Sequence, residues 1–250
     1  MSLKVTVVQL ATPNIDSYGM YSLASVNEYC NLHGYDHVVQ RSTSVPDLHI
    51  NWSKIDLLRH ALTLDNDYVV LFDADVVIAD QKKSIEYFLD HYANETTEIM
   101  MPRDTYLAFG SRRKRRPPRS MRPNAGFIIL RNSNTGRQMI QDWLDAARGE
   151  GKKYNDIHPR NQLVYWNFVM PRYISELQIL PDYVSSNTKH DYLRLLRPIP
   201  FMYHVMMSED SKRIKKMAKV YQAYNNPAYL EKVRPVLQVN DGIIKIKELV

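Results

Sequence analysis

The sequence predicts an α/β protein with a mostly parallel central sheet flanked by helices. β-prone runs alternate along the chain with stretches that place apolar residues at helical spacing. The run DYVVLF (67–72) is apolar on successive positions, which is typical of a strand covered on both faces in a parallel sheet. With 250 residues, 44% of them hydrophobic, the chain is long enough for one large core.

The first elements form a β-α-β unit. The run KVTVVQLA (4–11) predicts a strand, a helix is expected over 18–32 because Gly34 can terminate it, and YDHVVQ (35–40) predicts a second strand. The elements expected next are, in order, a helix at 53–64, the strand at 67–72, strands at 97–102 and 125–132, and helices at 134–148 and 161–170.

The C-terminal part departs from this alternation. A helix is expected over 209–224, and the later sequence Asn-Asp-Gly at 240–242 separates two β-prone runs, which is a hairpin turn signal. We therefore expect one main domain over residues 1–225 and a C-terminal elaboration over 226–250 that forms a β-hairpin.

Cysteine content and hydropathy suggest a soluble, cytoplasmic protein. The single cysteine, Cys30, cannot form a disulfide within the chain, which fits a reducing compartment. The first 20 residues lack the pattern of a secretory signal, and no apolar run approaches the roughly 18 residues that span a bilayer. We expect no transmembrane segment.

The positive charge is concentrated in one short run. Residues 112–122 (RRKRRPPRSMR) contain seven Lys or Arg and no acid, which exceeds the net charge of +6 of the whole chain. A solvated extended loop, a loop that faces phosphate groups near an active site, and a nucleic-acid or targeting patch all fit this composition. Nucleic acid is the least favoured partner, because no aromatic residues alternate with the charges to stack on bases.

Two carboxylates follow the buried strand. Asp73 and Asp75 lie where the strand 67–72 ends, and ligands of open parallel sheets bind outside the carboxyl ends of the strands. Carboxylates at i and i+2 can both turn toward one hard cation, which offsets their desolvation and mutual repulsion. The pair predicts a divalent metal site, although the D-x-D pattern alone also fits two solvated residues at a strand end.

Other classes of phosphate-binding protein fit the sequence less well. A haloacid-dehalogenase-like phosphatase needs a later Gly-Asp or Asp-Asp pair, and the sequence contains neither dipeptide. The eight glycines form no G-x-G-x-x-G and no G-x-x-x-x-G-K-[ST] pattern, which argues against ordinary dinucleotide and P-loop sites.

Four segments together resemble a known family. EYCNLHGYD (28–36), WSKIDLLRHAL (52–62), YVVLFDADVVI (68–78) and NAGFIILRNS (124–133) occur in the order found in family 34 glycosyltransferases, the galactosyl-, xylosyl- and mannosyltransferases of the GT-A fold. More distantly, the chain is similar to family 8 retaining glycosyltransferases. The resemblance covers roughly residues 4–217 and implies transfer of a sugar from a UDP- or GDP-sugar to a glycan or glycoprotein acceptor.

The resemblance also implies a Mn²⁺ site formed by Asp73, Asp75 and His204. His204 matches the family's late H-x-x-G motif, in which Met207 replaces the glycine. Two carboxylates and an imidazole suit Mn²⁺ better than Mg²⁺, the second candidate, because Mg²⁺ favours oxygen ligands.

Cations are expected around the phosphates of the donor. Lys54 lies at the start of a helix after the second strand, where its ammonium and the helix dipole would both attract an anion. Beyond the H-x-x-G position, Lys212 or Arg213 would reach the diphosphate.

The expected contacts to the other parts of the donor are those that the resemblance implies. Ala11 and Thr12, just after the first strand, stand where the GT-A pattern places backbone contacts to the base and ribose. Asn124, Ala125 and Gly126 resemble the donor-sugar segment, in which small residues let the sugar approach the backbone and the amide bonds its hydroxyls.

Gln162 and Asp104 are the catalytic candidates. Gln162, also expected to contact the donor, corresponds to the Gln of the family's Asp-Gln pair, but Asn161 stands where the family has the acid. Asp104 resembles an acid that the family places before its N-x-G segment. The resemblance implies retention of configuration, with the leaving phosphate accepting the acceptor's proton. If the reaction inverts, Asp104 is the candidate base.

Two other functions stay open on the sequence alone. A sugar-nucleotide hydrolase or phosphotransferase would use the same metal site. The missing acid at Asn161, the missing glycine at Met207 and the basic run also fit a catalytically degenerate module that binds sugar nucleotides or nucleic acid.

Overall fold

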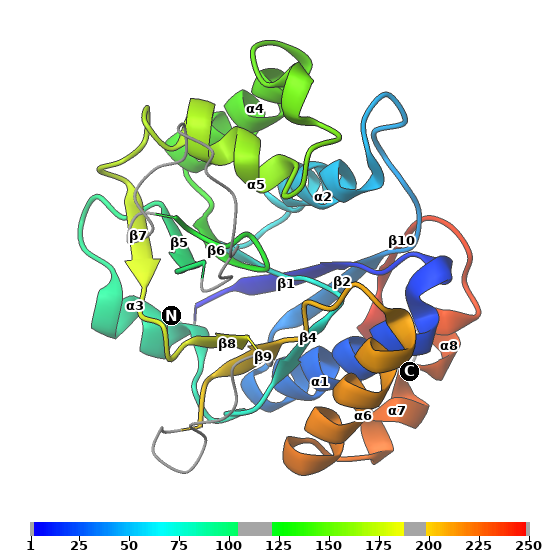
Figure 1. Cartoon of the computed structure of the whole chain (residues 1–250). Helices are drawn as coiled ribbons and strands as arrows, with labels where there is room; N and C mark the ends of the chain where they lie inside the picture. Colours follow the sequence, from blue (N-terminus) through cyan, green and yellow to red (C-terminus); the bar gives the residue numbers. More distant parts are fainter. Residues whose placement is uncertain (1–2, 105–121, 188–198, 249–250) are drawn as a thin grey trace.

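The fold is built around a seven-stranded sheet (Figure 1). The computed structural model describes residues 3–104, 122–187 and 199–248. The strands lie in the order β10-β2-β1-β3-β6-β5-β7. Their bounds are β1 Val5–Leu10, β2 Asp36–Gln40, β3 Tyr68–Phe72, β5 Ile99–Pro102, β6 Phe127–Arg131, β7 Leu177–Leu180 and β10 Ile243–Lys245.

Among the described strands of this sheet, five run in the same direction. β1 pairs in parallel with both β2 and β3, and β5 pairs in parallel with β7. β6 lies antiparallel between β3 and β5, and β10 is antiparallel to β2 at the edge. The predicted α/β class with a mostly parallel sheet is therefore confirmed.

Helices cover both faces of the sheet. In Figure 1, α2, α4 and α5 lie above the sheet, and α1, α6 and α7 lie below it. Their bounds are α1 Asp16–His33, α2 Ser53–Ala61, α3 Ile85–Tyr92, α4 Asn134–Arg148, α5 Asn161–Val164, α6 Asp210–Tyr224, α7 Ala228–Lys232 and α8 Arg234–Leu237. α5 continues into the π-helical turn η5, Tyr165–Val169.

Local signals set where several helices begin and end. Gly34 ends α1 with a φ of 76°, a left-handed conformation that glycine adopts without steric cost. The Ser84 side chain accepts a hydrogen bond from Tyr87 N–H at the start of α3, and Ser133 accepts one from Gly136 N–H at the start of α4. These caps satisfy backbone donors that the first helical turn leaves free.

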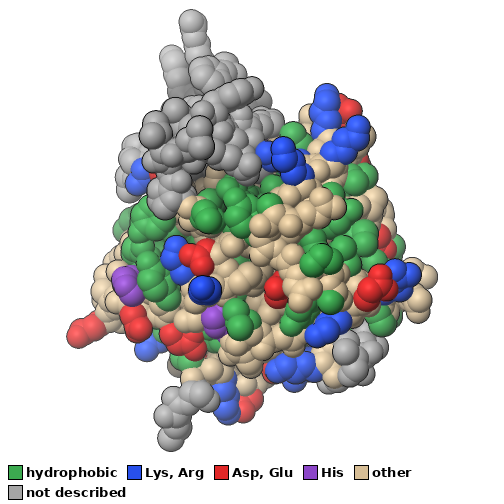
Figure 2. Space-filling view, turned by 90° about the horizontal axis from the view of Figure 1, so that it is seen from below, with side chains coloured by type: hydrophobic (Ala, Val, Ile, Leu, Met, Phe, Trp, Pro, Cys, Tyr) green, Lys and Arg blue, Asp and Glu red, His purple; other side chains and the backbone are tan. Residues whose placement is uncertain are grey.

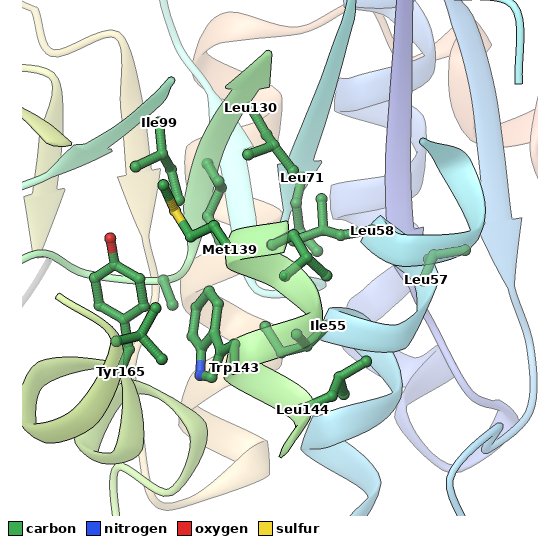
Figure 3. Close-up of a cluster of buried hydrophobic side chains, with 14 of the residues drawn as sticks. Ile55, Leu57, Leu58, Leu71, Ile99, Leu130, Met139, Trp143, Leu144 and Tyr165 are labelled. Carbon is green, nitrogen blue, oxygen red and sulfur yellow. The ribbon is translucent and has the colours of Figure 1, made fainter. Parts of the chain in front are cut away.

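Hydrophobic clusters on both faces hold the helices against the sheet. Figure 3 shows the layer above the sheet, in which Leu58 of α2 and Trp143 of α4 pack with Leu71 of β3. The neighbouring strand residue, Val70, belongs to the layer below, together with Tyr29 of α1. Because successive strand residues face opposite sides, β3 contributes to both layers. Full burial of an aliphatic side chain of this kind stabilises the fold by about 1.5–3 kcal/mol.

A second, three-stranded sheet joins segments that are distant in sequence. Its strands are β4 Val76–Ile78, β9 Met202–His204 and β8 Ser185–Asn187, in the order β4-β9-β8. β4 and β9 are antiparallel, with Val76 opposite His204. This pairing places residue 204 beside the turn that carries Asp73 and Asp75.

The C-terminal hairpin that the sequence predicts is not formed. Residues 234–237 form the helix α8, and the second run forms β10, which pairs with β2 so that Ile243 lies opposite Gln40. Gly242, with a φ of 87°, turns the chain into β10 and accepts a hydrogen bond from Arg41 N–H at 2.9 Å. The open edge of β2 offers unpaired backbone groups that the last strand satisfies. The domain boundary at residue 225 stays an expectation.

The surface carries charges of both signs. On the face shown in Figure 2, Lys and Arg side chains lie interspersed with Asp and Glu. Of the basic run, only Arg122 lies within the described residues, and its guanidinium lies 5.8 Å from the centroid of the Trp166 ring. The remaining basic residues of that run lie outside the described part. Among the described helices, none combines the length and apolar character needed to cross a membrane.

Candidate active site

The two carboxylates of the D-x-D motif lie in the turn between β3 and β4. Asp73 N–H donates to Gly126 O at 2.9 Å, and the Ser22 hydroxyl of α1 donates to Asp73 O at 3.1 Å. The turn follows a strand whose last four residues are buried, so the side chains emerge where the chain leaves the core. Asp73 is 25% exposed and Asp75 20% exposed, which leaves both partly open to a ligand.

His204 completes a cluster of three ligating side chains. Its Nε2 lies 3.0 Å from Asp75 Oδ1 and 3.8 Å from Asp73 Oδ2. Val205 N–H donates to Asp75 O at 2.8 Å, which fixes β9 against the D-x-D turn. One ligand atom from each of the three residues lies within 4.8 Å of the other two. Two carboxylate oxygens and an imidazole nitrogen form a donor set that fits a divalent metal ion.

Asp75 and His204 each stabilise the charged form of the other, and this shifts both pKa values. Burial lowers the pKa of His204, but the Asp75 carboxylate outweighs burial and raises that pKa above its ordinary 6.5. Burial raises the pKa of Asp75, but the charge and hydrogen bond of His204 outweigh burial and lower that pKa below 3.8. A proton on His204 Nε2 therefore lies between the imidazole and the carboxylate, in the place that a bound cation would take. The proton and the cation compete for this place.

Lys54 of α2 lies beside the cluster. Its ammonium donates to Asp73 Oδ1 at 2.7 Å and to Ala125 O at 3.0 Å, and its side chain is only 11% exposed. The structure thus brings Lys54 to the predicted site, where its charge offsets that of Asp73. Sequence reasoning placed Lys54 near an anion but did not identify the carboxylate that it contacts.

The segment 124–126 packs against His204. A Cβ on Gly126 would lie 2.3 Å from His204 Cε1 and 2.7 Å from His204 Nδ1, so only glycine leaves room for the imidazole. Asn124 Oδ1 accepts a hydrogen bond from Gly126 N–H at 2.8 Å. The small residue expected to admit a sugar therefore also admits the ring of His204.

The two catalytic candidates contact each other. Gln162 Nε2 donates to Asp104 Oδ2 at 3.0 Å, and Gln162 Oε1 accepts from Ala125 N–H at 2.9 Å. Asp104 is half-buried, and its N–H donates to Arg122 O at 2.7 Å. Gln162 thus joins the predicted acid to the predicted donor-sugar segment.

Ala11 and Thr12 follow β1 at the same edge of the sheet. Because β1 and β3 are parallel neighbours, the ends of the two strands lie side by side, and Ala11 packs in one hydrophobic cluster with Ala74. Ala11 N–H donates to Gln40 O at 2.9 Å, and Thr12 Oγ1 donates to Asn14 Oδ1 at 2.7 Å. Both residues are buried, and Arg41 Nη1 donates a hydrogen bond to Ala11 O, so both backbone polar groups of Ala11 have partners within the protein.

Of the two adjacent cations at the start of α6, the structure directs Arg213 toward the cluster. Lys212 is 68% exposed and pairs with Glu209 at 2.5 Å. Arg213 is 17% exposed, its guanidinium lies 4.6 Å from the centroid of the Tyr18 ring, and its charge helps to lower the pKa of Asp75. Successive helix residues point about 100° apart, so the sequence alone could not tell which cation faces the site.

The sheet and the cluster together define an α/β protein whose candidate site lies at the carboxyl ends of the strands. The chain belongs to the nucleotide-diphospho-sugar transferase family, whose model matches residues 17–223. It is therefore a glycosyltransferase, and the resemblance to GT-A enzymes seen in the sequence is confirmed. No curated protein sequence matches the chain.

Several solved glycosyltransferases share the fold. A glycosyltransferase involved in the glycosylation of the major capsid of PBCV-1 has a TM-score of 0.68 at 16% identity, over 86% of this chain and 99% of that chain. The galactosyltransferase LgtC has a TM-score of 0.56 at 11% identity, over 88% and 96% of the two chains. Mouse xyloside xylosyltransferase 1 has a TM-score of 0.50 at 9% identity, over 82% and 98%. At these identities the similarities establish the GT-A fold and nothing further about the substrate.

Proposed function

We propose that this glycosyltransferase binds a UDP- or GDP-sugar through Mn²⁺ and transfers the sugar, with retention, to a glycan or glycoprotein acceptor. The observation that carries the proposal is the cluster of Asp73, Asp75 and His204, whose ligand atoms lie within 4.8 Å of one another. We favour Mn²⁺ over Mg²⁺ because one of the three ligands is an imidazole. A bound cation would supply Lewis-acid stabilisation of the diphosphate that leaves.

Cationic side chains complete the proposed phosphate site. Lys54 pairs with Asp73, so the two carboxylates repel an approaching diphosphate less than free carboxylates would. Arg213 presents a planar guanidinium, which suits phosphate oxygens, and it already acts electrostatically on Asp75. We assign the contact with the diphosphate to Arg213 first and to Lys212 second.

Gln162 and Asp104 are the groups proposed to face the donor sugar. An amide is a weak nucleophile, and Gln162 Oε1 already accepts a hydrogen bond from Ala125. We therefore assign to Gln162 the placement of Asp104 and of the segment 124–126, and not attack on the sugar. In a retaining reaction the acceptor's proton passes to the leaving phosphate, and in an inverting reaction Asp104 would take it.

The nucleoside is proposed to lie over the end of β1. Ala11 and Thr12 lie there next to the D-x-D turn, because β1 and β3 end side by side. This placement would put the diphosphate between the nucleoside and the three metal ligands.

An assay of product identity separates this proposal from its alternatives. UDP- and GDP-sugars are incubated with Mn²⁺, with and without oligosaccharide acceptors, and products are resolved by mass spectrometry. We expect sugar on an acceptor, with loss of product when EDTA replaces Mn²⁺. Free sugar alone would indicate a hydrolase, and binding without turnover of any donor would indicate a degenerate module.

Nucleic-acid binding is separated by salt. Affinity for nucleic acid falls steeply as salt rises, whereas metal-bridged donor binding should respond mainly to the chelator. We expect the second behaviour.

A further inference from the structure

Asn161, the residue at which the chain departs from the Asp-Gln pair, joins two helices that reach the active site. Its Nδ2 donates to Asn51 O at 3.1 Å, and its Oδ1 accepts from Gln162 N–H at 2.8 Å. Asn51 lies in the short 3-10 turn η2, Ile50–Trp52, directly before α2. Asn161 is only 3% exposed, so its side chain is enclosed by protein.

The orientation of the Asn161 amide is fixed by its partners. The Asn51 carbonyl can only accept hydrogen bonds, and the Gln162 N–H, which also donates to Pro159 O at 3.1 Å, can only donate. Rotating the amide by 180° would place two acceptors together on one side and two donors together on the other. Both ends of the amide are therefore used inside the protein, and the backbone carbonyl of Asn161 accepts from Trp143 Nε1 at 2.9 Å.

The two helices that Asn161 joins converge again on Ala125. Lys54 of α2 donates to Ala125 O at 3.0 Å, and Gln162 of α5 accepts from Ala125 N–H at 2.9 Å. Three hydrogen bonds, Asn161 to Asn51, Lys54 to Ala125 and Ala125 to Gln162, form a closed ring with the chain segments 51–54 and 161–162. Both backbone groups of Ala125 are thereby held by helices that Asn161 ties together.

We propose that Asn161 is a positioning residue for glycosyl transfer, which locks α5 to the start of α2 and so sets Gln162 and Asp104 against the donor-sugar segment. The inference deepens the proposed function and rests on the assignment of Gln162 and Asp104 to the sugar. In this role residue 161 does not touch the donor, and an amide is required.

A carboxylate could not replace the amide without loss. An ionised aspartate has no hydrogen to donate, so one of its oxygens would face the Asn51 carbonyl with no hydrogen bond between them. Two facing acceptors in a buried place are destabilising. A protonated carboxyl group can donate to that carbonyl, and protonation would restore the contact. The variant Asn161→Asp should therefore depend on pH in a way that the wild type does not.

Other titratable groups near this position are shared by both proteins. His49 Nδ1 accepts from Asn51 N–H at 3.2 Å, and burial and the charge of Arg160 lower the pKa of His49. Asp104 lies across Gln162, and α4 contributes the non-titrating Trp143. The neighbouring turn η4, Lys152–Tyr154, adds two exposed lysines. Asn161→Ala keeps these groups without adding a charge, so its pH profile separates their titration from that of the new carboxyl group.

The experiment compares wild type and Asn161→Asp with a saturating Mn²⁺ sugar nucleotide from about pH 5.5 to about pH 8. At neutral pH we expect kcat to fall by about tenfold or more, while the donor dissociation constant changes by less than about threefold. As pH falls, the variant to wild-type ratio of kcat should rise several-fold. Asn155→Asp is the matched control, because Asn155 is also buried and donates from Nδ2 to a backbone carbonyl, Ala147 O, at 2.8 Å.

Two outcomes would overturn the inference. Activity of Asn161→Asp equal to or above wild type at neutral pH would mean that residue 161 faces the sugar as an acid. A loss that is independent of pH, or that Asn155→Asp reproduces, would mean that the effect is only on stability, which thermal unfolding measures in parallel. An inactive wild type would instead refute the proposed function.

A second variant covers the case in which Asn161→Asp does not fold. Asn161→Ala removes both hydrogen bonds without adding a charge. We expect it to lower kcat at all pH values and to leave donor affinity within about threefold of wild type. A large loss of donor affinity with unchanged kcat would show that the side chain contacts the donor, contrary to the inference.

Discussion

The pKa values of His204 and Asp75 determine how the proposed metal site responds to pH. The raised pKa of His204 means that its ion pair with Asp75 stabilises the metal-free fold fully below the ordinary histidine pKa of 6.5. That contribution is lost as pH rises through the raised pKa. The lowered pKa of Asp75 means that its own contribution is present above 3.8 and is lost as pH falls through the lowered value. A metal ion, in contrast, needs the deprotonated imidazole.

Mn²⁺ affinity should therefore depend on pH. Below the raised pKa of His204, we expect the affinity to fall by about tenfold per pH unit, because one proton must leave before the metal binds, and to level off above it. Calorimetric titration with Mn²⁺ at several pH values measures this slope. His204→Gln, which keeps an oxygen ligand, should give a weaker and flatter profile. The same slope in both proteins would show that His204 is not a ligand.

Gly126 is a second place where one atom matters. A methyl group there would meet His204 Cε1 at 2.3 Å, so Gly126→Ala must move the imidazole. We expect at least a tenfold loss of Mn²⁺ affinity by calorimetry. Gly19→Ala is the control, because its Cβ would lie 3.6 Å from Ile15 Cγ1, an ordinary contact, and alanine favours a helix by about 0.5–1 kcal/mol. Unchanged Mn²⁺ affinity in Gly126→Ala would show that the close approach of Gly126 to His204 does not matter for metal binding.

The sequence predicts the candidate ligands better than their neighbours. Asp73 and Asp75 follow a recognisable buried strand, and His204 follows from the family order, so all three could be named. The contact of Gly126 with His204 could not be, because it joins residues 78 positions apart through the pairing of two short strands. The Ser22 contact with Asp73 O could not be predicted either, because it joins a helix residue to a turn that is distant in the sequence.

Among the elements, β10 shows most directly how the C-terminal segment joins the body. Ile246, directly after β10, is 2% exposed and packs in the cluster that contains Val39 of β2, Val233 and Val236. Arg41, the residue after β2, is fully buried, pairs with Asp16, and donates to Val239 O. Through these contacts the C-terminal segment packs in the same hydrophobic core as β2.

Ile246→Ala should therefore destabilise the whole fold. We expect a loss of about 2–4 kcal/mol in the free energy of unfolding, because a buried side chain is removed. Ile243→Ala, at a position that is 46% exposed, should cost less than about 1 kcal/mol. Urea unfolding is followed by tryptophan fluorescence, since all three tryptophans lie in the opposite layer. If Ile246→Ala leaves the tryptophan transition unchanged, the segment unfolds independently of the body.

At this scale the sequence predicts long elements and misses short ones. The strands β1, β2, β3, β5 and β6 and the helices α1, α2, α4 and α6 were all expected near their observed positions. β4, β8 and β9 have three residues each, too few for a periodic pattern, and exist because they pair with one another. The hairpin prediction was wrong because β2, distant in sequence, offers β10 a better partner than a local strand. The Ser84 cap could have revealed α3.

For the molecule as a whole, the candidate site depends on the complete sheet. Ser22, Asp73, Ala125, Gln162 and His204 come from segments spread over most of the chain and meet at one edge. No local segment contains the site, so it forms only when the non-local strand pairs have formed. Arg122, the last residue of the basic run, also lies there, since Asp104 N–H donates to Arg122 O beside Gln162.

The central claim is that a metal ion held by Asp73, Asp75 and His204 binds the diphosphate of a nucleotide sugar. Calorimetric titration of UDP and of GDP, with Mn²⁺ and then with EDTA, tests it in the wild type and in Asp75→Asn, which keeps the shape of the side chain but removes its charge. We predict that one nucleotide binds with Mn²⁺, that EDTA abolishes binding, and that Asp75→Asn weakens it by about 100-fold or more. Equal binding with Mn²⁺ and with EDTA, or equal binding by both proteins, would contradict the claim.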